Sequence, residues 1–425
     1  MYHKTVLKNG VRIISEQLDY MRSVSLGIWV NAGSRDEDRS ENGISHFIEH
    51  MSFKGTRNRS SLQIARELDA IGGQSNAFTG KENTCFHGRV LGKHFKLFAN
   101  ILSDISLNST FEPDDMELER QVILKEVSMM EDMPDDNIHV LFNRLFWVDH
   151  PIGMPILGTR ETVSSIGRET IQKYINKFYV PERILVVASG DVDHQSMVSS
   201  FEPFFESFSN RGNLNSEKST PPRSNAGISI HFKDLEQVHI CLGGEAPSYV
   251  SEKRFVCAIL NTILGGNMSS RLFQEIRENR GLAYSICSFL SLYIDAGLLG
   301  IYAATDQNKV NSVLETIQTE IIKIRKGELS ESDLSAAKEY LTGGIYLASE
   351  SADSRMMRIA KDEIIFGRYV SYEELVSKLE TVTVDDVIEV ARDIFREDQI
   401  SLVTLGPFKE EELDKGTLQF SSGIS

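Results

Sequence analysis

Residues 208–227 read FSNRGNLNSEKSTPPRSNAG and divide the chain into two halves. This stretch is rich in Ser, Asn, Pro and Gly and has almost no large apolar side chains. Such a composition is typical of an exposed linker, because it favours turns and can bury little surface. A linker at the middle of a 425-residue chain predicts two domains. We place the domains at residues 1–210 and 227–425, with a linker at 211–226.

The two halves repeat one order of sequence patterns. Each opens with two strand-like segments, continues with two helices and a glycine-marked turn into a strand pair, and then has amphipathic helices before a final strand. The final strands are RILVVASG at 183–190 and QISLVTLG at 399–406. The repeat predicts a duplicated α+β unit, in which a mainly antiparallel sheet is covered by helices on one face. Two unrelated domains would not explain the repeated order.

The composition limits the class of partner. Hydrophobic residues make up 41% of the chain and charged residues 25%, which is the profile of a globular protein with a large core. The formal net charge is −16, and no basic tract is present to neutralise phosphates, so we expect no nucleic-acid partner. No stretch is apolar for long enough to span a bilayer, so we also expect no membrane partner.

The cysteines and the first residues bear on the compartment. The first residues, MYHKTVLKNGVRIISEQ, are polar and lack the apolar core of a signal peptide. The cysteines lie among apolar neighbours without paired spacing, which favours buried free thiols in a reducing environment. We therefore expect a cytoplasmic protein with four buried thiols, at Cys85, Cys241, Cys257 and Cys287.

Residues 46–50 read HFIEH, with two histidines four residues apart. On a helix, His46 and His50 project from the same face. Such a pair can supply two of the ligands of a tetrahedral zinc site. Glu49 lies beside this face, where it can act on a metal-bound water. The alternative is an amphipathic helix that contains two histidines by chance, so the motif needs a third ligand.

Two glutamates further along the chain are candidates for that ligand. Glu119 and Glu126 are two helical turns apart, so their carboxylates face nearly the same way. One of them can bind a metal while the other hydrogen-bonds a histidine ligand. The apolar run VIL at 122–124 predicts that this helix is largely buried, and buried carboxylates need a partner. The alternative is a solvated acidic helix face.

These stretches resemble a known family. GISHFIEHMSFKGT at 43–56 carries the H-x-x-E-H order, the reverse of the usual zinc peptidase motif. Together with ERQVILKEVSMMED at 119–132 it resembles the pitrilysin–insulysin family of zinc peptidases. The resemblance is closest to the short-chain branch related to the mitochondrial processing peptidase beta subunit. It covers essentially the whole chain, including GGQSNAFTGKENT at 72–84 and RENRGLAYSI at 277–286.

The resemblance implies an activity and a set of residues that perform it. The expected activity is zinc-dependent hydrolysis of oligopeptides or unfolded protein segments. The resemblance implies that Glu49 is the general base and that Glu119 orients a histidine ligand. The implied ligands of one zinc ion (Zn²⁺) per chain are His46, His50 and Glu126.

The resemblance also implies residues that contact the substrate. Arg277 and Tyr284 would lie opposite the zinc and hold the substrate backbone and the oxyanion. Asn76 and Ala77 would lie on a strand that accepts the peptide as an added edge strand. The alternatives are a surface arginine, a half-buried strand aromatic and ordinary sheet structure.

Two further histidines are interpreted as structural. The proposed ligand set is complete without His150, and a catalytic zinc must keep one position open. His87 alternates with apolar neighbours on a predicted strand, which is typical of a structural side chain. Neither is therefore expected to bind the metal.

The zinc motif occurs only in the first half, and the Arg277/Tyr284 pair only in the second. Members of the family that are twice as long fold four such domains into a clamshell with the zinc facing the fourth domain. A two-domain chain can rebuild this clamshell as a homodimer, which we expect here, with peptides or unfolded segments as substrates. One alternative is a non-catalytic member that acts as a scaffold or binding subunit. Another is a processing peptidase that needs a different partner chain.

Overall fold

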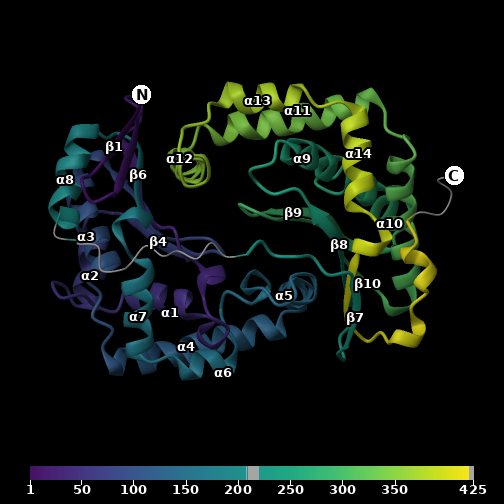
Figure 1. Ribbon diagram of the computed structural model, residues 1–425, viewed down its shortest axis with the longest axis horizontal. Helices are drawn as coiled ribbons and strands as arrows, with labels where there is room; N and C mark the ends of the chain where they lie inside the picture. Colours follow the sequence, from purple (N-terminus) through teal and green to yellow (C-terminus); the bar gives the residue numbers. More distant parts are fainter. Residues whose placement is uncertain (207, 209–219, 421–425) are drawn as a thin grey trace. The chain divides into compact units, whose positions relative to one another are not determined.

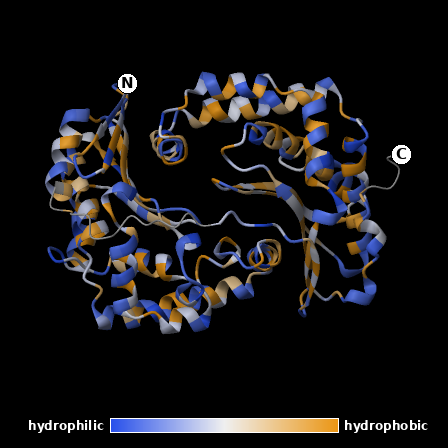
Figure 2. Ribbon diagram, viewed as in Figure 1, coloured by the Kyte–Doolittle hydropathy of each residue, from blue (hydrophilic) through white to orange (hydrophobic). Residues whose placement is uncertain are grey.

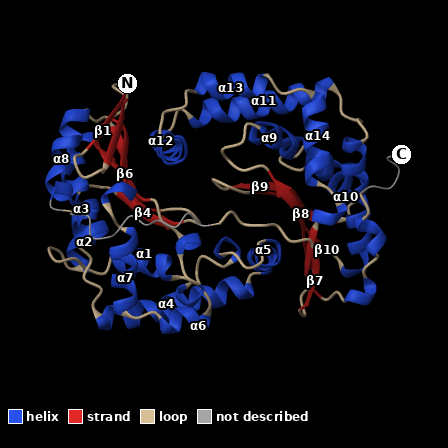
Figure 3. Ribbon diagram, viewed as in Figure 1, coloured by secondary structure: helices blue, strands red, loops and turns tan. Residues whose placement is uncertain are grey.

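The structure is a computed structural model that describes residues 1–206, 208 and 220–420. Most of the expected linker, residues 211–219, lies outside this range, and residues 220–226 form no helix or strand. The described chain folds into two compact units, each with its own sheet (Figure 1, Figure 3). The first unit comprises Met1–Met129, Met154–Ser219 and Leu347–Tyr369, and the second comprises Met130–Gly153, Thr220–Tyr346 and Val370–Ser425.

The sheet of the first unit has six strands in the order β1-β2-β6-β3-β5-β4. The β2–β6 pair is parallel, and every other neighbouring pair is antiparallel. The strand β4 therefore forms one edge of this sheet. The strands are β1 (Tyr2–Val6), β2 (Arg12–Gln17), β3 (Ser23–Val30), β4 (Gln74–Thr79), β5 (Thr84–Leu91) and β6 (Ile184–Gly190).

The sheet of the second unit has the order β7-β11-β8-β10-β9, and its single parallel pair is β7–β11. Strand for strand this order matches β2-β6-β3-β5-β4, and the parallel pair falls in the same place. The predicted α+β duplication with mainly antiparallel sheets is confirmed. The strands are β7 (Gly227–Phe232), β8 (Val238–Ala246), β9 (Ala283–Leu292), β10 (Gly297–Thr305) and β11 (Ser401–Gly406).

The helices follow the repeat as well. Those that lie wholly or mostly in the first unit are α1 (Ile44–Ser52), α2 (Ser61–Ala70), α3 (Phe95–Leu107), α4 (Pro113–Asp132), α6 (Arg160–Ser165), α7 (Arg168–Phe178), α8 (His194–Glu206) and α12 (Ala352–Phe366). Those that lie wholly or mostly in the second unit are α5 (Pro134–Phe146), α9 (Lys253–Leu264), α10 (Val310–Arg325), α11 (Glu331–Ala348), α13 (Tyr372–Glu380) and α14 (Val384–Ile394), with a π-helical segment at Phe273–Asn279.

The central strands bury both of their faces. On β3, alternate residues such as Leu26 and Ile28 pack into the main core under α3 and α8, whereas Trp29 points to the opposite face. That opposite face is covered by α12, through Met356 and Ile359. Because both faces are covered, seven of the eight residues of β3 are buried, including Ser25, whose hydroxyl donates to Asp353 of α12. The helices that cover the sheets carry both hydrophobic and hydrophilic residues (Figure 2). The sequence predicted helices on one face of the sheet only. In the first unit the structure also places one helix, α12, on the other face.

The second unit has the same arrangement. Its main core contains Leu242 of β8 and Leu402 of β11, and the opposite face carries α5 through Ile138, Phe142 and Phe146. The helices on the second faces come from the other half of the sequence. Helix α5 precedes the linker but belongs to the second unit, and α12 follows the linker but belongs to the first. The compact units therefore differ from the contiguous halves at residues 130–153 and 347–369.

Three of the four cysteines are buried free thiols, as expected. The expectation is wrong for Cys287, which is exposed on β9. The reason is its position, because β9 is an edge strand of its sheet. No helix within the described residues is long and apolar enough to cross a membrane.

Candidate metal centre

Helix α1 presents the H-x-x-E-H motif on its less buried side. Ile44, Phe47, Ile48 and Met51 recur at helical spacing and anchor α1 in the core of the first unit. The remaining positions of the motif, His46, Glu49 and His50, are partly exposed. These three side chains are therefore accessible to solvent.

A glycine is needed where α1 begins. The N-cap residue Gly43 has φ +96°, a left-handed conformation that a side chain rarely adopts. A Cβ at this position would also lie 2.8 Å from Leu157 O and 2.9 Å from the Cα of Gly158. Only glycine fits both requirements, so it fixes the start of the metal-motif helix.

Helix α4 carries the two candidate glutamates, but it is less buried than the sequence indicated. Only four of its 20 residues are buried, namely Met116, Glu119, Ile123 and Val127. Val122, in the apolar run that suggested burial, is 41% exposed. The expectation of a largely buried helix is therefore wrong, because α4 packs along one narrow stripe. Glu119 lies on that stripe, and Glu126 lies at its border with 38% of its side chain exposed.

The structure brings His46, His50 and Glu126 together. One ligand atom from each lies within 4.8 Å of the other two, and these three form the one such group of His, Cys, Asp or Glu among the residues described. Glu126 Oε2 is 3.7 Å from His46 Nε2 and 3.5 Å from His50 Nε2. Two ligands of a tetrahedral zinc ion are about 3.4 Å apart, so this spacing and the N, N, O donor set fit zinc.

Glu119 contacts one of the two imidazoles. Its Oε2 lies 3.0 Å from His50 Nδ1, and its Oε1 forms an ion pair with Lys54 Nζ at 2.5 Å. A carboxylate at Nδ1 favours a proton there, which leaves a lone pair on His50 Nε2, the atom 3.5 Å from Glu126 Oε2. His46 Nδ1 is buried and has no such partner among the described residues. Lys54 was missed by the sequence argument, although it follows His50 by one helical turn.

Burial shifts the protonation of the group. Desolvation, and then the nearby His50, lower the pKa of His46 to about 3, so its imidazole is neutral and able to bind a metal. Burial raises the pKa of Glu49, and the charge of Glu126 adds to this. The hydrogen bond from Thr79 and the proximity of His50 oppose the rise. Glu49 is thus a stronger base than an exposed carboxylate.

The edge strand β4 runs beside α1. The Thr79 hydroxyl at its end donates to Glu49 Oε2, a contact that the sequence argument also missed. Asn76 is exposed on this strand and Ala77 is half-buried. Among the described residues β4 pairs only with β5, so its outer edge is open. The Ala77 N–H donates to Asn76 Oδ1 at 2.9 Å, within the strand itself.

Arg277 and Tyr284 lie close to each other in the second unit. The Arg277 guanidinium is 4.6 Å from the centre of the Tyr284 ring and 4.9 Å from that of Phe273. Tyr284 is 75% exposed, so the alternative of a half-buried strand aromatic is wrong. The pair belongs to a different compact unit from the three metal-binding candidates.

The two histidines interpreted as structural do not join the metal group. His150 Nε2 lies 3.1 Å from Thr220 O, and its Nδ1 accepts the Ile152 N–H. His87 is half-buried on β5, with its ring edge-on to Phe78 at 5.7 Å. Each histidine therefore contacts residues of its own compact unit and not the metal group.

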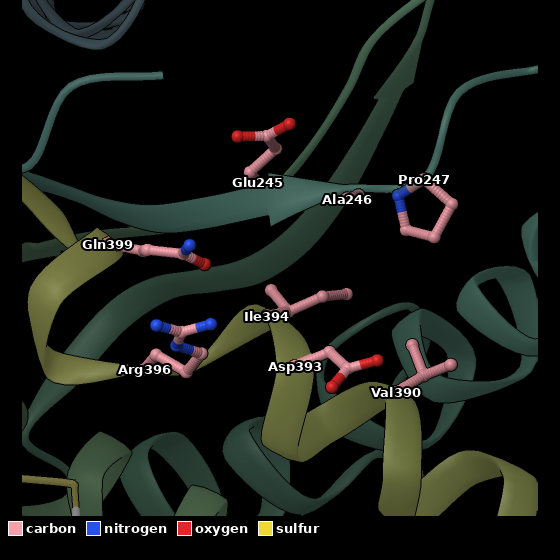
Figure 4. Close-up of a pocket in the computed structure, with 8 residues that line it drawn as sticks. All are labelled: Glu245, Ala246, Pro247, Val390, Asp393, Ile394, Arg396 and Gln399. Atoms are coloured by element: carbon pink, nitrogen blue, oxygen red, sulfur yellow. The ribbon is translucent and has the colours of Figure 1, made fainter. Parts of the chain in front are cut away.

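The second unit also has a shallow hollow of about 290 Å³ (Figure 4). Two of its charged groups are already paired, Asp393 with Lys253 at 3.3 Å and Arg396 with Asp398 at 2.8 Å. Its lining contains none of the candidate site residues. The lining residues are Glu245, Ala246, Pro247, Val390, Asp393, Ile394, Arg396 and Gln399.

Comparison with known proteins places the chain in a family. Residues 12–160 match the family described as insulinase (peptidase family M16), and residues 165–341 match the peptidase M16 inactive domain. The chain is 37% identical to the uncharacterized zinc protease YmxG of Bacillus subtilis, over 94% of this chain and 97% of that protein. It is 39% identical to an uncharacterized zinc protease of Rickettsia felis, over 94% of this chain and 96% of that protein.

Two solved structures share the fold. A protease from Helicobacter pylori superposes with a TM-score of 0.89 at 22% identity, covering 96% of this chain and 99% of that one. A peptidase M16 inactive domain from Pseudomonas fluorescens superposes with a TM-score of 0.87 at 18% identity, covering 96% and 98%. At this identity the superpositions establish the two-domain fold, while the sequence matches establish the relationship. The chain therefore belongs to the insulinase family, peptidase family M16.

Proposed function

We propose that this protein is a zinc-dependent endopeptidase that hydrolyses oligopeptides or unfolded protein segments. The observation that carries the proposal is the convergence of His46, His50 and Glu126 beside a raised-pKa carboxylate, Glu49. The names of its relatives, which are called zinc proteases, support the same activity. One zinc ion per chain would be held by the two imidazoles and the Glu126 carboxylate.

The chemistry follows from the residues around that group. When bound by these residues, zinc would lower the pKa of a water ligand to about 7 and would polarise the scissile carbonyl. Glu49 accepts a proton from the water and then donates it to the leaving amine. Thr79 hydrogen-bonds Glu49 Oε2, which leaves Oε1 as the oxygen that exchanges the proton. Glu119 keeps the His50 ring in its ligating orientation.

The open edge of β4 is suited to binding an extended peptide. Main-chain groups of Asn76 and Ala77 would pair with the substrate as an added strand, next to Glu49 through the Thr79 contact. Binding of this kind takes its affinity from the backbone and tolerates diverse side chains. The proposed substrates are therefore defined by their extended conformation.

We further propose that the enzyme works as a homodimer with a clamshell chamber. In this arrangement Arg277 and Tyr284 of one protomer hold the substrate backbone and the oxyanion at the zinc of the other. The proposal is supported by the separate placement of the two sets of residues, one in each compact unit. The match of the second half to a domain described as inactive agrees with a supporting role for that half.

The test combines zinc content with cleavage of a quenched fluorogenic peptide. For the purified chain we expect one zinc per chain, and for Glu49→Gln we expect the same zinc content with a loss of about 10²–10⁴-fold in kcat. Glu117→Gln, an exposed carboxyl on α4, serves as the matched control and should behave like the wild type.

Other outcomes identify other functions. Cleavage unaffected by Glu49→Gln would overturn the mechanism. Bound zinc with no cleavage by the wild type would favour the scaffold alternative. Cleavage that appears only when a second, different chain is added would favour the partner-dependent alternative.

A further inference from the structure

Helix α1 has no cap of its own. Its N-cap residue, Gly43, has no side chain, so the first amide groups of the helix need an acceptor from elsewhere. Glu37 supplies it from outside the helix. Its Oε2 accepts the Gly43 N–H at 2.8 Å and the Asn42 side-chain amide at 2.9 Å, and its Oε1 accepts the Ser45 N–H at 2.9 Å. The cap is buried, because Glu37 is only 3% exposed.

The contacts of Glu37 match its ionised form. All three partners are donors, and a carboxylate is a pure acceptor. A negative charge at this end also interacts favourably with the helix dipole. Two ionisable groups that interact with its charge are the half-buried Lys81 ammonium and the Tyr174 hydroxyl, which lies 2.8 Å from Ser45 Oγ.

Keeping this group charged is costly. Burial raises the pKa of Glu37 to about 7, although the hydrogen bonds from Ser45, Gly43 and Asn42 oppose the rise. Burial also lowers the pKa of Lys81 to about 8, which the charge of Glu37 opposes. A neutral side chain would avoid the desolvation. The proton transfers proposed above do not use Glu37, so its buried charge calls for another role.

We propose that Glu37 is a positioning residue, whose carboxylate fixes the start of α1 and thereby the places of His46, Glu49 and His50. The mechanical link is short, because the Ser45 amide that Glu37 binds directly precedes His46. Asn42 extends the link by donating also to Pro155 O, in the segment against which Gly43 packs. The catalytic consequence rests on the proposed peptidase function, whereas the fixing of α1 does not.

The test compares Glu37→Gln with wild type in the full chain. Glutamine keeps the size of the side chain, but its NH₂ group would face the Gly43, Ser45 and Asn42 N–H groups that donate to the carboxylate in the wild type. In the metal-free protein we expect amide hydrogen exchange to accelerate at least tenfold in residues 43–52, while α3 keeps its wild-type rates. Zinc affinity, measured by competition with a chelator, should weaken at least tenfold. Peptide cleavage should lose kcat with little change in KM.

The matched control is Ser60→Ala, which removes the cap of the neighbouring helix α2. It should accelerate exchange in α2 and leave zinc affinity unchanged. This separates the loss of any helix cap from the loss of the cap on the motif helix.

Two results would overturn the proposal. One is zinc affinity within twofold of wild type together with unchanged exchange in residues 43–52. The other is exchange that accelerates equally over the whole first unit, which would make Glu37 a general structural residue.

If Glu37→Gln does not fold, Glu37→Asp decides, because the shorter carboxylate cannot reach both Gly43 and Ser45. Wild-type exchange and zinc affinity in Glu37→Asp would also overturn it. Exchange and zinc affinity give the answer even if the wild type cleaves no peptide.

Discussion

At the scale of single residues, we propose that the metal group depends on carboxylates outside the ligand set. Glu119 is buried, lies 3.0 Å from His50 Nδ1 and binds Lys54 with its other oxygen. Glu119→Gln keeps the shape but removes the charge that both partners face. We expect zinc affinity to weaken by about 10–100-fold, measured by chelator competition. Glu117→Gln, two residues earlier and exposed, should change nothing. Equal affinities for the two variants would show that Glu119 does not orient the ligand.

A second residue-scale prediction concerns pH. Burial raises the pKa of Glu37 from 4.5 to about 7, so the folded state binds a proton more tightly than the unfolded state between these values. The contribution of Glu37 to the free energy of unfolding is therefore greatest below pH 4.5 and declines as pH rises to about 7. As pH rises over this range, the unfolding free energy of the wild type should fall by up to about 3 kcal/mol relative to that of Glu37→Gln, which has no carboxyl group at this position. Urea unfolding of both proteins at a series of pH values measures this difference. Parallel pH profiles would contradict the shift.

At the scale of elements, the site is made by two helices packed on one core. Ile123 is fully buried and lies between the two glutamates of α4, so it fixes the distance of that helix from α1. Ile123→Ala should cost about 2–5 kcal/mol of unfolding free energy and also weaken zinc binding. Leu118→Ala on the same helix, where the side chain is 67% exposed, should cost less than about 0.5 kcal/mol. Loss of stability with unchanged zinc affinity would show that α4 packing does not determine the site.

At the scale of the whole molecule, the proposed dimer can be tested by complementation. Glu49→Gln lacks the general base, and Arg277→Ala lacks the opposing arginine, so each variant alone should have little activity. In an equal mixture, half of the dimers carry one copy of each, and one of their two sites is complete. We expect about one quarter of wild-type activity after subunit exchange. No recovery on mixing would contradict a site shared between protomers, as would full activity of the wild type at a dilution where it is monomeric.

Much of the fold and of the metal group could be predicted from the sequence. The repeated pattern gave the duplicated α+β units, whose sheets match strand for strand. The H-x-x-E-H spacing placed two imidazoles on one helix face, because the helical repeat is a local property. The burial of α4 was not predictable from its VIL run, since Ile123 is buried whereas its neighbour Val122 is 41% exposed. The contacts of Thr79 and Lys54 were not predicted from the sequence. Thr79 is the last residue of β4 and Lys54 lies just beyond the end of α1, so each contact depends on where that strand or helix ends.

The sequence by itself determined what depends on neighbours in the chain: the strands and helices, their duplicated order, the paired histidines and the paired glutamates. Only the tertiary structure decided what depends on contact between distant segments. It brought Glu126 to the histidines, turned Glu37 under the start of α1, and assigned α5 and α12 to units outside their own halves of the sequence. The physical reason is that hydrogen bonding within helices and turns is set over a few residues, whereas burial is decided by the packing of whole elements.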